Sequence, residues 1–204
     1  MRIVCISDTH NGKPKVPDGD ILIHAGDLTM NGTFMEIVKV GDWLRELPHK
    51  HKVVIAGNHD FLFEKDINLA KNALGPGLTY LQDSATEIEG LKFYGSPWTP
   101  RFFDWAFNVD RGQLYRKWNL IPEGLDVLIT HGPPAGILDK NAPAWGGIHV
   151  GCTELYDAVK LVRPKLHVFG HIHESNGRLD QDGTIFVNAA VGYRLEHKAV
   201  VVDL

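Results

Sequence analysis

Aspartate, asparagine and histidine side chains recur in short groups along this 204-residue chain. Each group follows a short apolar run, and each contains residue types that bind metal ions through oxygen or imidazole nitrogen. The candidate metal ligands are Asp8, His10, Asp27, Asn58, His131, His171 and His173. Because seven side chains exceed the usual protein ligand set of one ion, the sequence predicts a site for two ions.

The spacing within the groups allows their members to reach one cavity. Asp8 and His10 are two residues apart, as are His171 and His173, and side chains at positions i and i+2 project to the same side of an extended segment. Asp27 is the natural bridge between two ions, because a carboxylate can bind one metal through each oxygen. These features predict two ions that share one carboxylate.

A pair of divalent ions would give this site a particular chemistry. With Asp8 and Asp27 as anionic ligands, the net charge would be about +2, which attracts a phosphate group. Two ions also stabilise the attacking and leaving oxygens and lower the pKa of bound water toward about 7. The sequence therefore predicts hydrolysis of a phosphate ester.

Any one of these motifs has a more ordinary explanation. A single Asp-x-His or His-x-His pair is more often part of the solvated surface than a metal site. The ordered succession of five motifs, each after an apolar run, favours the metal site. His24 and His167 lie inside apolar runs, which is typical of hydrogen-bonded core histidines.

The apolar runs are rich in β-branched residues and are expected to be strands. Several are continuously apolar, which is typical of strands covered on both faces. Since the carboxyl ends of parallel strands converge on one crevice, ligands far apart in the sequence can meet there. The predicted strands cover 3–6, 20–24, 52–55, 91–94, 126–129, 166–169, 184–187 and 198–202.

Three segments with apolar residues at helical spacing, 33–47, 61–74 and 153–162, are predicted helices. Strands and helices alternate in the first half, whereas strands crowd together in the second. No repeat or linker divides the chain, so we expect a mixed α/β fold that forms a single domain over 1–204.

The composition excludes several classes of protein. Lys and Arg total 21 against 25 for Asp and Glu, a net charge of −4, which lacks the basic excess of a bulk nucleic-acid binder. Two cysteines form no disulfide framework. No apolar run reaches the roughly 18 residues of a membrane span, and the N-terminal run lacks an export-signal pattern. We expect a cytoplasmic protein without membrane contact; the sequence indicates no oligomeric state.

Two further segments are candidates for substrate contacts. Arg101 lies in an irregular aromatic stretch between residues 96 and 122 and could pair with a phosphate, while its aromatic neighbours could stack a nucleobase. Irregularly spaced Trp and Phe more often belong to a core, so both roles stay open for this stretch. His149 lies in the glycine-containing loop 146–152, which either borders the cleft or is purely structural.

The ordered motifs resemble those of the calcineurin-like metallophosphoesterases, D-x-H, G-D, G-N-H-D/E, a later H, and G-H-x-H. The chain supplies them in that order at 8–10, 26–27, 57–60, 131 and 170–173. The stretches 22–27, 95–98 and 164–174 look most like the MPPED-type adult-brain phosphodiesterase subgroup. The resemblance implies a four-layer α/β/β/α metallophosphoesterase sandwich, with mixed sheets and flanking helices, that covers the chain from Met1 to about Leu204.

The resemblance also implies the role of each site residue. His59 matches the catalytic histidine, which is expected to protonate the leaving oxygen while a metal-bridging hydroxide attacks in line. The expected cofactors are two divalent or trivalent transition-metal ions (Mn, Fe, Zn, Co or Ni, with Mn favoured). The implied ligand sets are Asp8, His10, Asp27 and His173 for one ion and Asp27, Asn58, His131 and His171 for the other.

The sequence departs from the related protein Ser/Thr phosphatases. After Asp27 the chain reads LTM rather than V-D-R-G, so neither their activity nor their histidine-orienting aspartate is implied. Asp60 is a candidate substitute that would orient His59. Some MPPED-type relatives carry glycine at the position of His173, and the histidine here favours a complete two-ion site.

These observations predict a metal-dependent phosphoesterase, most simply a phosphodiesterase that acts on small phosphodiesters, with cyclic nucleotides among the candidate substrates. One alternative is a phosphomonoesterase or nucleotide pyrophosphatase with the same centre. Another is a metal-binding scaffold that keeps the fold for protein contacts without catalysis. The intact His59 and the complete ligand set favour an enzyme.

Overall fold

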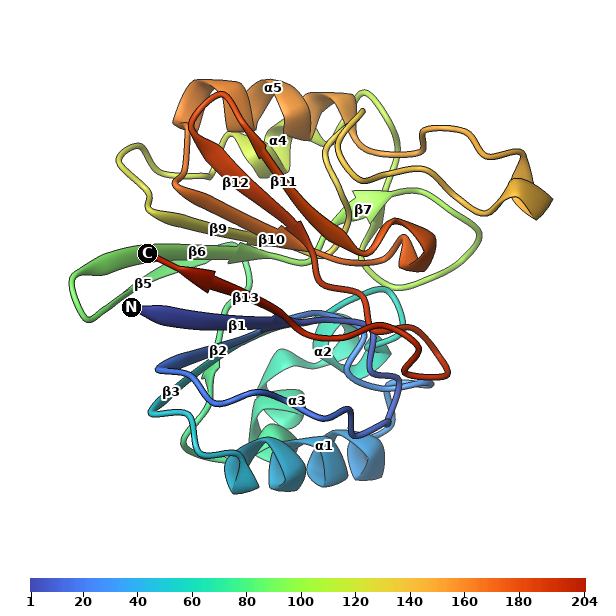
Figure 1. The fold of residues 1–204 in the computed structure, drawn as a ribbon. Coiled ribbons are helices and arrows are strands. Elements are labelled where there is room, and N and C mark those ends of the chain that lie inside the picture. The colour runs from blue at the N-terminus through green and yellow to red at the C-terminus, as the bar shows by residue number, and fades with distance from the viewer.

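The computed structural model describes residues 1–204 and arranges them in four layers (Figure 1). Two β-sheets pack face to face, and helices cover the outer face of each sheet. This arrangement confirms the predicted α/β/β/α fold.

The first sheet has the strand order β13-β1-β2-β3-β4. Its strands are β1 (Arg2–Ile6), β2 (Ile21–Ala25), β3 (His51–Ile55), β4 (Thr79–Tyr80) and β13 (Val200–Asp203). Strands β1 to β4 run parallel, and β13 pairs antiparallel with β1. The carboxyl ends of β1, β2 and β3 therefore lie side by side at one edge, on the right in Figure 1.

The second sheet has the order β11-β12-β10-β9-β6-β5. Its strands are β5 (Ser84–Ile88), β6 (Leu91–Ser96), β9 (Val127–Thr130), β10 (Leu166–Phe169), β11 (Gly177–Gln181) and β12 (Thr184–Asn188). The four central strands are parallel, and β5 and β11 add antiparallel edges. A separate pair, β7 (Thr99–Pro100) and β8 (Asn108–Val109), lies in the aromatic stretch.

Alternate residues of the central strands enter different cores. In β1, Ile3 and Cys5 pack between the two sheets, whereas Val4 and Ile6 pack beneath the helices of the first sheet. A third core lies between the second sheet and its own helices. Because both faces of these strands are buried, their sequences are apolar throughout instead of alternating.

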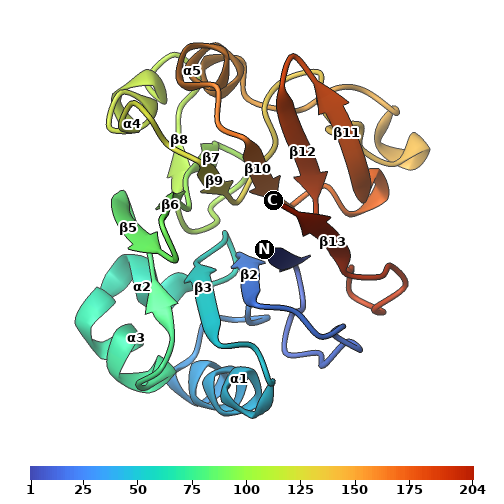
Figure 2. The same cartoon turned by 60° about the vertical axis from the view of Figure 1, so that its left-hand side comes forward.

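The helices form the two outer layers (Figure 2). They are α1 (Phe34–Glu46), α2 (Phe61–Lys65) and α3 (Ile67–Leu74) on the first sheet, α4 (Tyr115–Trp118) and α5 (Thr153–Val162) on the second, with short 3-10 turns η1 (Pro143–Trp145) and η2 (His173–Ser175).

The predicted helix 61–74 is broken at Asp66, whose carboxylate accepts hydrogen bonds from the N–H groups of Asn68 and Leu69 and so begins a new helix. No helix combines the length and apolar character needed to cross a bilayer.

The aromatic stretch 96–122 contributes to both a core and a cavity, the two roles that its sequence left open. Phe107 and Trp118 are buried in the outer cores. Phe102 and Trp105 line a cavity beside the predicted ligands. The stretch thus divides its aromatic side chains between stability and the site.

Candidate metal centre

Every predicted metal ligand lies within four residues of the carboxyl end of a strand. The first sheet supplies Asp8 and His10 after β1, Asp27 after β2 and Asn58 after β3, and the second sheet supplies His131 after β9 and His171 and His173 after β10. The two sheets contribute from facing edges, so their packing brings the ligands into one site.

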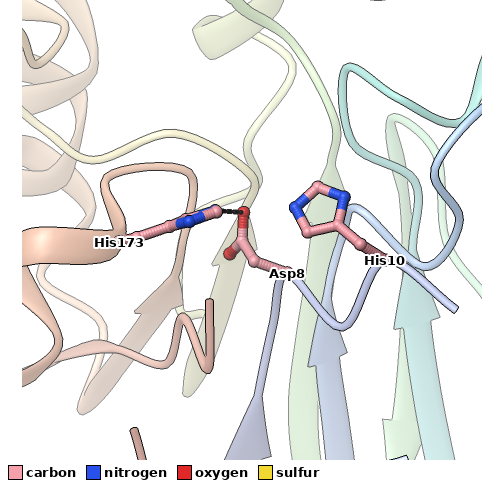
Figure 3. A group of neighbouring side chains, drawn as sticks. All are labelled: Asp8, His10 and His173. Atoms are coloured by element: carbon pink, nitrogen blue, oxygen red, sulfur yellow. Dashed lines mark hydrogen bonds and ion pairs between the residues drawn. The ribbon is translucent and has the colours of Figure 1, made fainter. Parts of the chain in front are cut away.

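Two of these side chains, His10 and His173, converge on Asp8 (Figure 3). The ligand atoms of Asp8, His10 and His173, which we call the Asp8 group, lie within 4.8 Å of one another. His10 and His173 flank the carboxylate, and His173 Nε2 lies 3.2 Å from Asp8 Oδ1. Asp8 Oδ2 also accepts the backbone N–H of His171 at 2.9 Å. This bond ties the loop after β10 to the loop after β1.

A second cluster forms around Asp27. The ligand atoms of Asp27, His131 and His171, the Asp27 group, also lie within 4.8 Å of one another. Asp27 Oδ1 is 3.4 Å from His131 Nε2, whereas Asp27 Oδ2 is 3.7 Å from His10 Nε2. Asn58 Oδ1 joins this cluster, 2.9 Å from His131 Nε2. The two oxygens of Asp27 thus face the two groups separately, as a bridging ligand requires.

The backbone at the ligands is strained. Asp8, His10, Asp27 and His171 have φ values of 57°, 44°, 53° and 67°, a region that residues other than glycine seldom adopt. Such conformations persist only where the surrounding structure enforces them, and they concentrate at functional sites. The strain is therefore evidence that these loops are shaped for a function.

Both buried carboxylates are held in the charged form. Burial alone would raise the pKa of Asp8, but the hydrogen bond and positive charge of His173 outweigh it and hold that pKa below its ordinary value. Burial of Asp27 is outweighed in the same way by the charge and hydrogen bond of His131. Burial alone would lower the pKa of His131, but the attraction of Asp27 raises it to about 9. The fold thus keeps two buried carboxylate ligands in the anionic form.

His10 carries the clearest sign of a missing partner. Both of its ring nitrogens are buried, and neither has a hydrogen-bond partner. Burying an imidazole without partners is costly, and the nearest carboxylate oxygen, from Asp27, is 3.7 Å from Nε2. A cation would satisfy this nitrogen and both carboxylates. The donors, oxygen and imidazole nitrogen, therefore fit transition-metal ions.

His59 lies beside both groups. Its backbone N–H donates to Asp27 Oδ1 at 2.8 Å, and its ring Nδ1 lies 2.7 Å from the carbonyl oxygen of Met30. Because a carbonyl only accepts, Nδ1 must carry a proton, which leaves Nε2 for other partners. The ring also packs against Trp105, with centroids 4.2 Å apart. His59 is thus held by its backbone, one ring nitrogen and one ring contact.

The prediction that Asp60 orients His59 is wrong. The Asp60 carboxylate is fully buried and faces the backbone of two ligand loops instead, and the Met30 carbonyl holds the His59 ring. The Asp60 carboxylate accepts hydrogen bonds from the N–H groups of Leu28, Thr29 and Gly57 and from the hydroxyl of Thr29. Asp60 therefore fastens the loop after β2 to the loop after β3.

A cavity of about 400 Å³ opens onto both groups. Arg101 lines it but forms an ion pair with Asp110. Arg111 also lines it and donates to the Gly151 carbonyl at 3.0 Å, which joins the two loops that border the cavity. His149 is not among the lining residues; its Nδ1 contacts the buried carboxylate of Asp139.

Comparison with known proteins identifies the family. Residues 1–175 match the model of the calcineurin-like phosphoesterases. The chain belongs to this family. Over its full length it is 44% identical to metallophosphoesterase domain-containing protein 1 of Homo sapiens, of which it covers 71%. It is also 44% identical, over 94% of its length, to a UPF0046 protein of Caenorhabditis elegans, of which it covers 75%.

Solved structures share the fold of this calcineurin-like phosphoesterase. Protein TT1561 of Thermus thermophilus matches with a TM-score of 0.66 at 13% identity, over 99% of this chain and 98% of that one. Phosphopantetheinyl hydrolase of Mycobacterium tuberculosis matches with a TM-score of 0.60 at 16% identity, over 95% and 90%. Family membership confirms the predicted metal-dependent phosphoesterase and its likeness to the MPPED-type subgroup.

Proposed function

We propose that this phosphoesterase is a phosphodiesterase that acts on small phosphodiesters with two transition-metal ions, Mn being favoured. The placement of Asp27 supports the two-ion site, because one of its oxygens faces His131 and the other faces His10. The proposed ligands are Asp8, His10, Asp27 and His173 for one ion and Asp27, Asn58, His131 and His171 for the other.

The ions would polarise the phosphate and lower the pKa of a bound water, which makes a nucleophile available near neutral pH. The chain supplies the remaining functions. The strained loops hold the ligands in place, and Asp60 locks two of those loops together. His59, anchored through Nδ1, directs Nε2 to the leaving oxygen and supplies its proton.

The cavity supports a small diester as substrate. Its volume of about 400 Å³ lies in the range of small-molecule sites. Phe102 and Trp105 offer apolar surface beside the ligands for the second ester group, a group that a monoester lacks. A net charge of −4 makes bulk nucleic acid a poor partner. Cyclic nucleotides are therefore suitable first candidates.

Replacing His59 tests the proposed chemistry. His59→Ala should lower turnover of diphenyl phosphate, whose leaving oxygen needs a proton, by about 100-fold, the usual contribution of a positioned proton donor, while bound Mn stays unchanged. The matched control is His51→Ala, because the His51 side chain bonds to the exposed Glu89 and lies away from the cavity. Unchanged turnover at equal metal content would remove His59 from catalysis.

The alternatives have their own outcomes in the same assay. A mono-4-nitrophenyl phosphate rate above the bis-4-nitrophenyl phosphate rate would establish a phosphomonoesterase instead. Absence of chelator-sensitive turnover across diesters, monoesters and nucleotide pyrophosphates would establish a non-catalytic scaffold.

A further inference from the structure

Tyr193 joins the Asp8 group to His59 from an unexpected part of the chain. It lies in the loop between β12 and β13, beyond the residues 1–175 that the family model matches. Its ring stacks on His10 at 4.2 Å between centroids and an interplanar angle of 27°, and it meets the His173 ring edge-on at 4.7 Å. Its hydroxyl lies 3.4 Å from His59 Nε2. One side chain therefore contacts both halves of the proposed machinery.

The contact with His59 falls on the nitrogen that the proposed chemistry uses. Since Nδ1 is committed to the Met30 carbonyl, the Tyr193 hydroxyl is the one protein group bonded to Nε2. A phenol both donates and accepts, so it can stay beside Nε2 whether or not that nitrogen carries a proton. The distance is longer than an ideal bond, as is common for catalytic pairs before substrate binds.

The rings of Trp105 and His10 limit how the His59 ring can move. Trp105 packs against this ring at 4.2 Å, and the His10 ring meets it edge-on at 4.7 Å. Tyr193 is stacked on His10, so its hydroxyl is held in place by the same side chains that form the Asp8 group. Tyr193 can therefore place its hydroxyl beside the catalytic histidine according to the positions of the ligand side chains.

We propose that Tyr193 is a positioning residue for His59, an inference that rests on the proposed function. In the step concerned, a water oxygen forms a new bond to phosphorus and the bond to the leaving oxygen breaks. The proton on Nε2 passes to the leaving oxygen, and the proton lost by water restores His59. The Tyr193 hydroxyl keeps Nε2 aligned with the leaving oxygen during this transfer.

Tyr193→Phe separates this role from simple packing, because it removes the hydroxyl and keeps the stacked ring. Diphenyl phosphate has a poor leaving group that needs the proton, whereas bis-4-nitrophenyl phosphate has a good one. With Mn-loaded protein, we expect kcat to fall about tenfold on diphenyl phosphate and less than about twofold on the nitrophenyl ester, with KM nearly unchanged. The matched control, Tyr115→Phe, lies on α4 away from the cavity and should leave both rates unchanged.

A double-mutant cycle and a spectrum supply independent readouts. In a His59→Ala background, Tyr193→Phe should cause no further loss, because the two residues act as one unit. In Zn-loaded, ¹⁵N-histidine-labelled protein, the Nε2 resonance of His59 should shift in Tyr193→Phe and stay in place in Tyr115→Phe. The spectrum requires no turnover.

The outcomes distinguish this inference from the proposed function. Equal losses on both esters, additive losses in the cycle, an unmoved Nε2 resonance, or a raised KM with unchanged kcat would each overturn the role of Tyr193 and leave the phosphodiesterase standing. Full turnover by His59→Ala, or no turnover by the unaltered protein, would overturn the proposed function and this inference with it.

Discussion

At the scale of single residues, Gly170 determines how closely two ligand loops can approach. A Cβ atom at this position would lie 2.1 Å from Asp8 Oδ2 and 2.2 Å from Ser7 Oγ, far inside van der Waals contact. The neighbouring backbone N–H of His171 is bonded to the same carboxylate. The absence of a side chain at Gly170 is thus a condition for the position of Asp8.

Gly170→Ala should therefore damage metal binding directly. We expect bound Mn to fall by at least about half and diester turnover by at least about tenfold, because Asp8 must move to admit the methyl group. Metal analysis after gel filtration measures the first effect. Gly183→Asn is the control, since it lies at a φ of 84° with nothing within 4 Å of its Cβ position and asparagine tolerates this conformation. Full metal content in Gly170→Ala would show that Asp8 keeps its position without the glycine.

The residue types and their order were enough to single out the seven side chains that the structure brings together as the Asp8 group, the Asp27 group and Asn58. They could not predict how His59 is held, because its ring partner is the backbone carbonyl of Met30, and a carbonyl leaves no mark in the sequence. Tyr193 was also missed, since one tyrosine in an irregular loop has no distinguishing spacing. Its sole sequence signal is a polar aromatic residue shortly after a buried strand.

At the scale of elements, Asp66 explains why one predicted helix is two. Apolar spacing favours a continuous helix over 61–74, but the Asp66 side chain competes by capping the backbone N–H groups that follow it. Local capping chemistry therefore overrides the periodic pattern at this point.

Asp66→Ala should remove this cap without touching the metal centre. Loss of an N-cap costs about 1 kcal/mol, so the free energy of unfolding in urea should fall by about that amount while diester turnover stays unchanged. An unchanged free energy of unfolding would show that the cap is not what begins α3.

His167 in β10 gives the fold a defined sensitivity to acid. Its ring is fully buried between Phe169 and Phe186, and Nε2 lies 2.8 Å from the Thr130 hydroxyl. Burial lowers the pKa of His167 from 6.5 to about 3. As the pH falls, His167 is therefore protonated near pH 6.5 in the unfolded chain but only near pH 3 in the folded chain. The contribution of His167 to stability is full above pH 6.5 and decreases as the pH falls toward 3.

The stability of His167→Gln should depend less on pH than that of the unaltered protein. Between pH 7.5 and pH 5, His167 should account for a loss of about 2 kcal/mol in the free energy of unfolding. The free energy of unfolding of the variant, measured by urea denaturation at both pH values, should therefore fall by about 2 kcal/mol less than that of the unaltered protein. Identical pH dependence in the two proteins would show that the ring is accessible to protons.

The central strands were predictable because both of their faces are buried and their sequences are apolar throughout. The edge strands β5 and β11, with sequences SATEI and GRLDQ, were missed. Their residues are mostly polar and only partly buried, and their pairing is set by the neighbouring strands β6 and β12. The strands β5 and β11 are therefore determined by pairing with their neighbours and not by the hydrophobicity of their own sequences.

At the scale of the whole molecule, the site depends on how the two sheets pack. The first sheet supplies the Asp8–His10 and Asp27 loops, and the second supplies His131, His171 and His173. The apolar core between the sheets, which includes Ile3, Val127 and Val168, fixes the distance between these loops. The sequence predicted that the ligands would meet, but distances within 4.8 Å follow from this packing.

The proposed two-ion site requires that Asp27 join two metal positions. Anomalous diffraction from crystals of the Mn-loaded protein can show this arrangement, because each bound ion gives its own peak. We expect two peaks on either side of the Asp27 carboxylate, one beside the Asp8 group and the other beside His131, His171 and Asn58. A single peak, or two peaks without Asp27 between them, would contradict it.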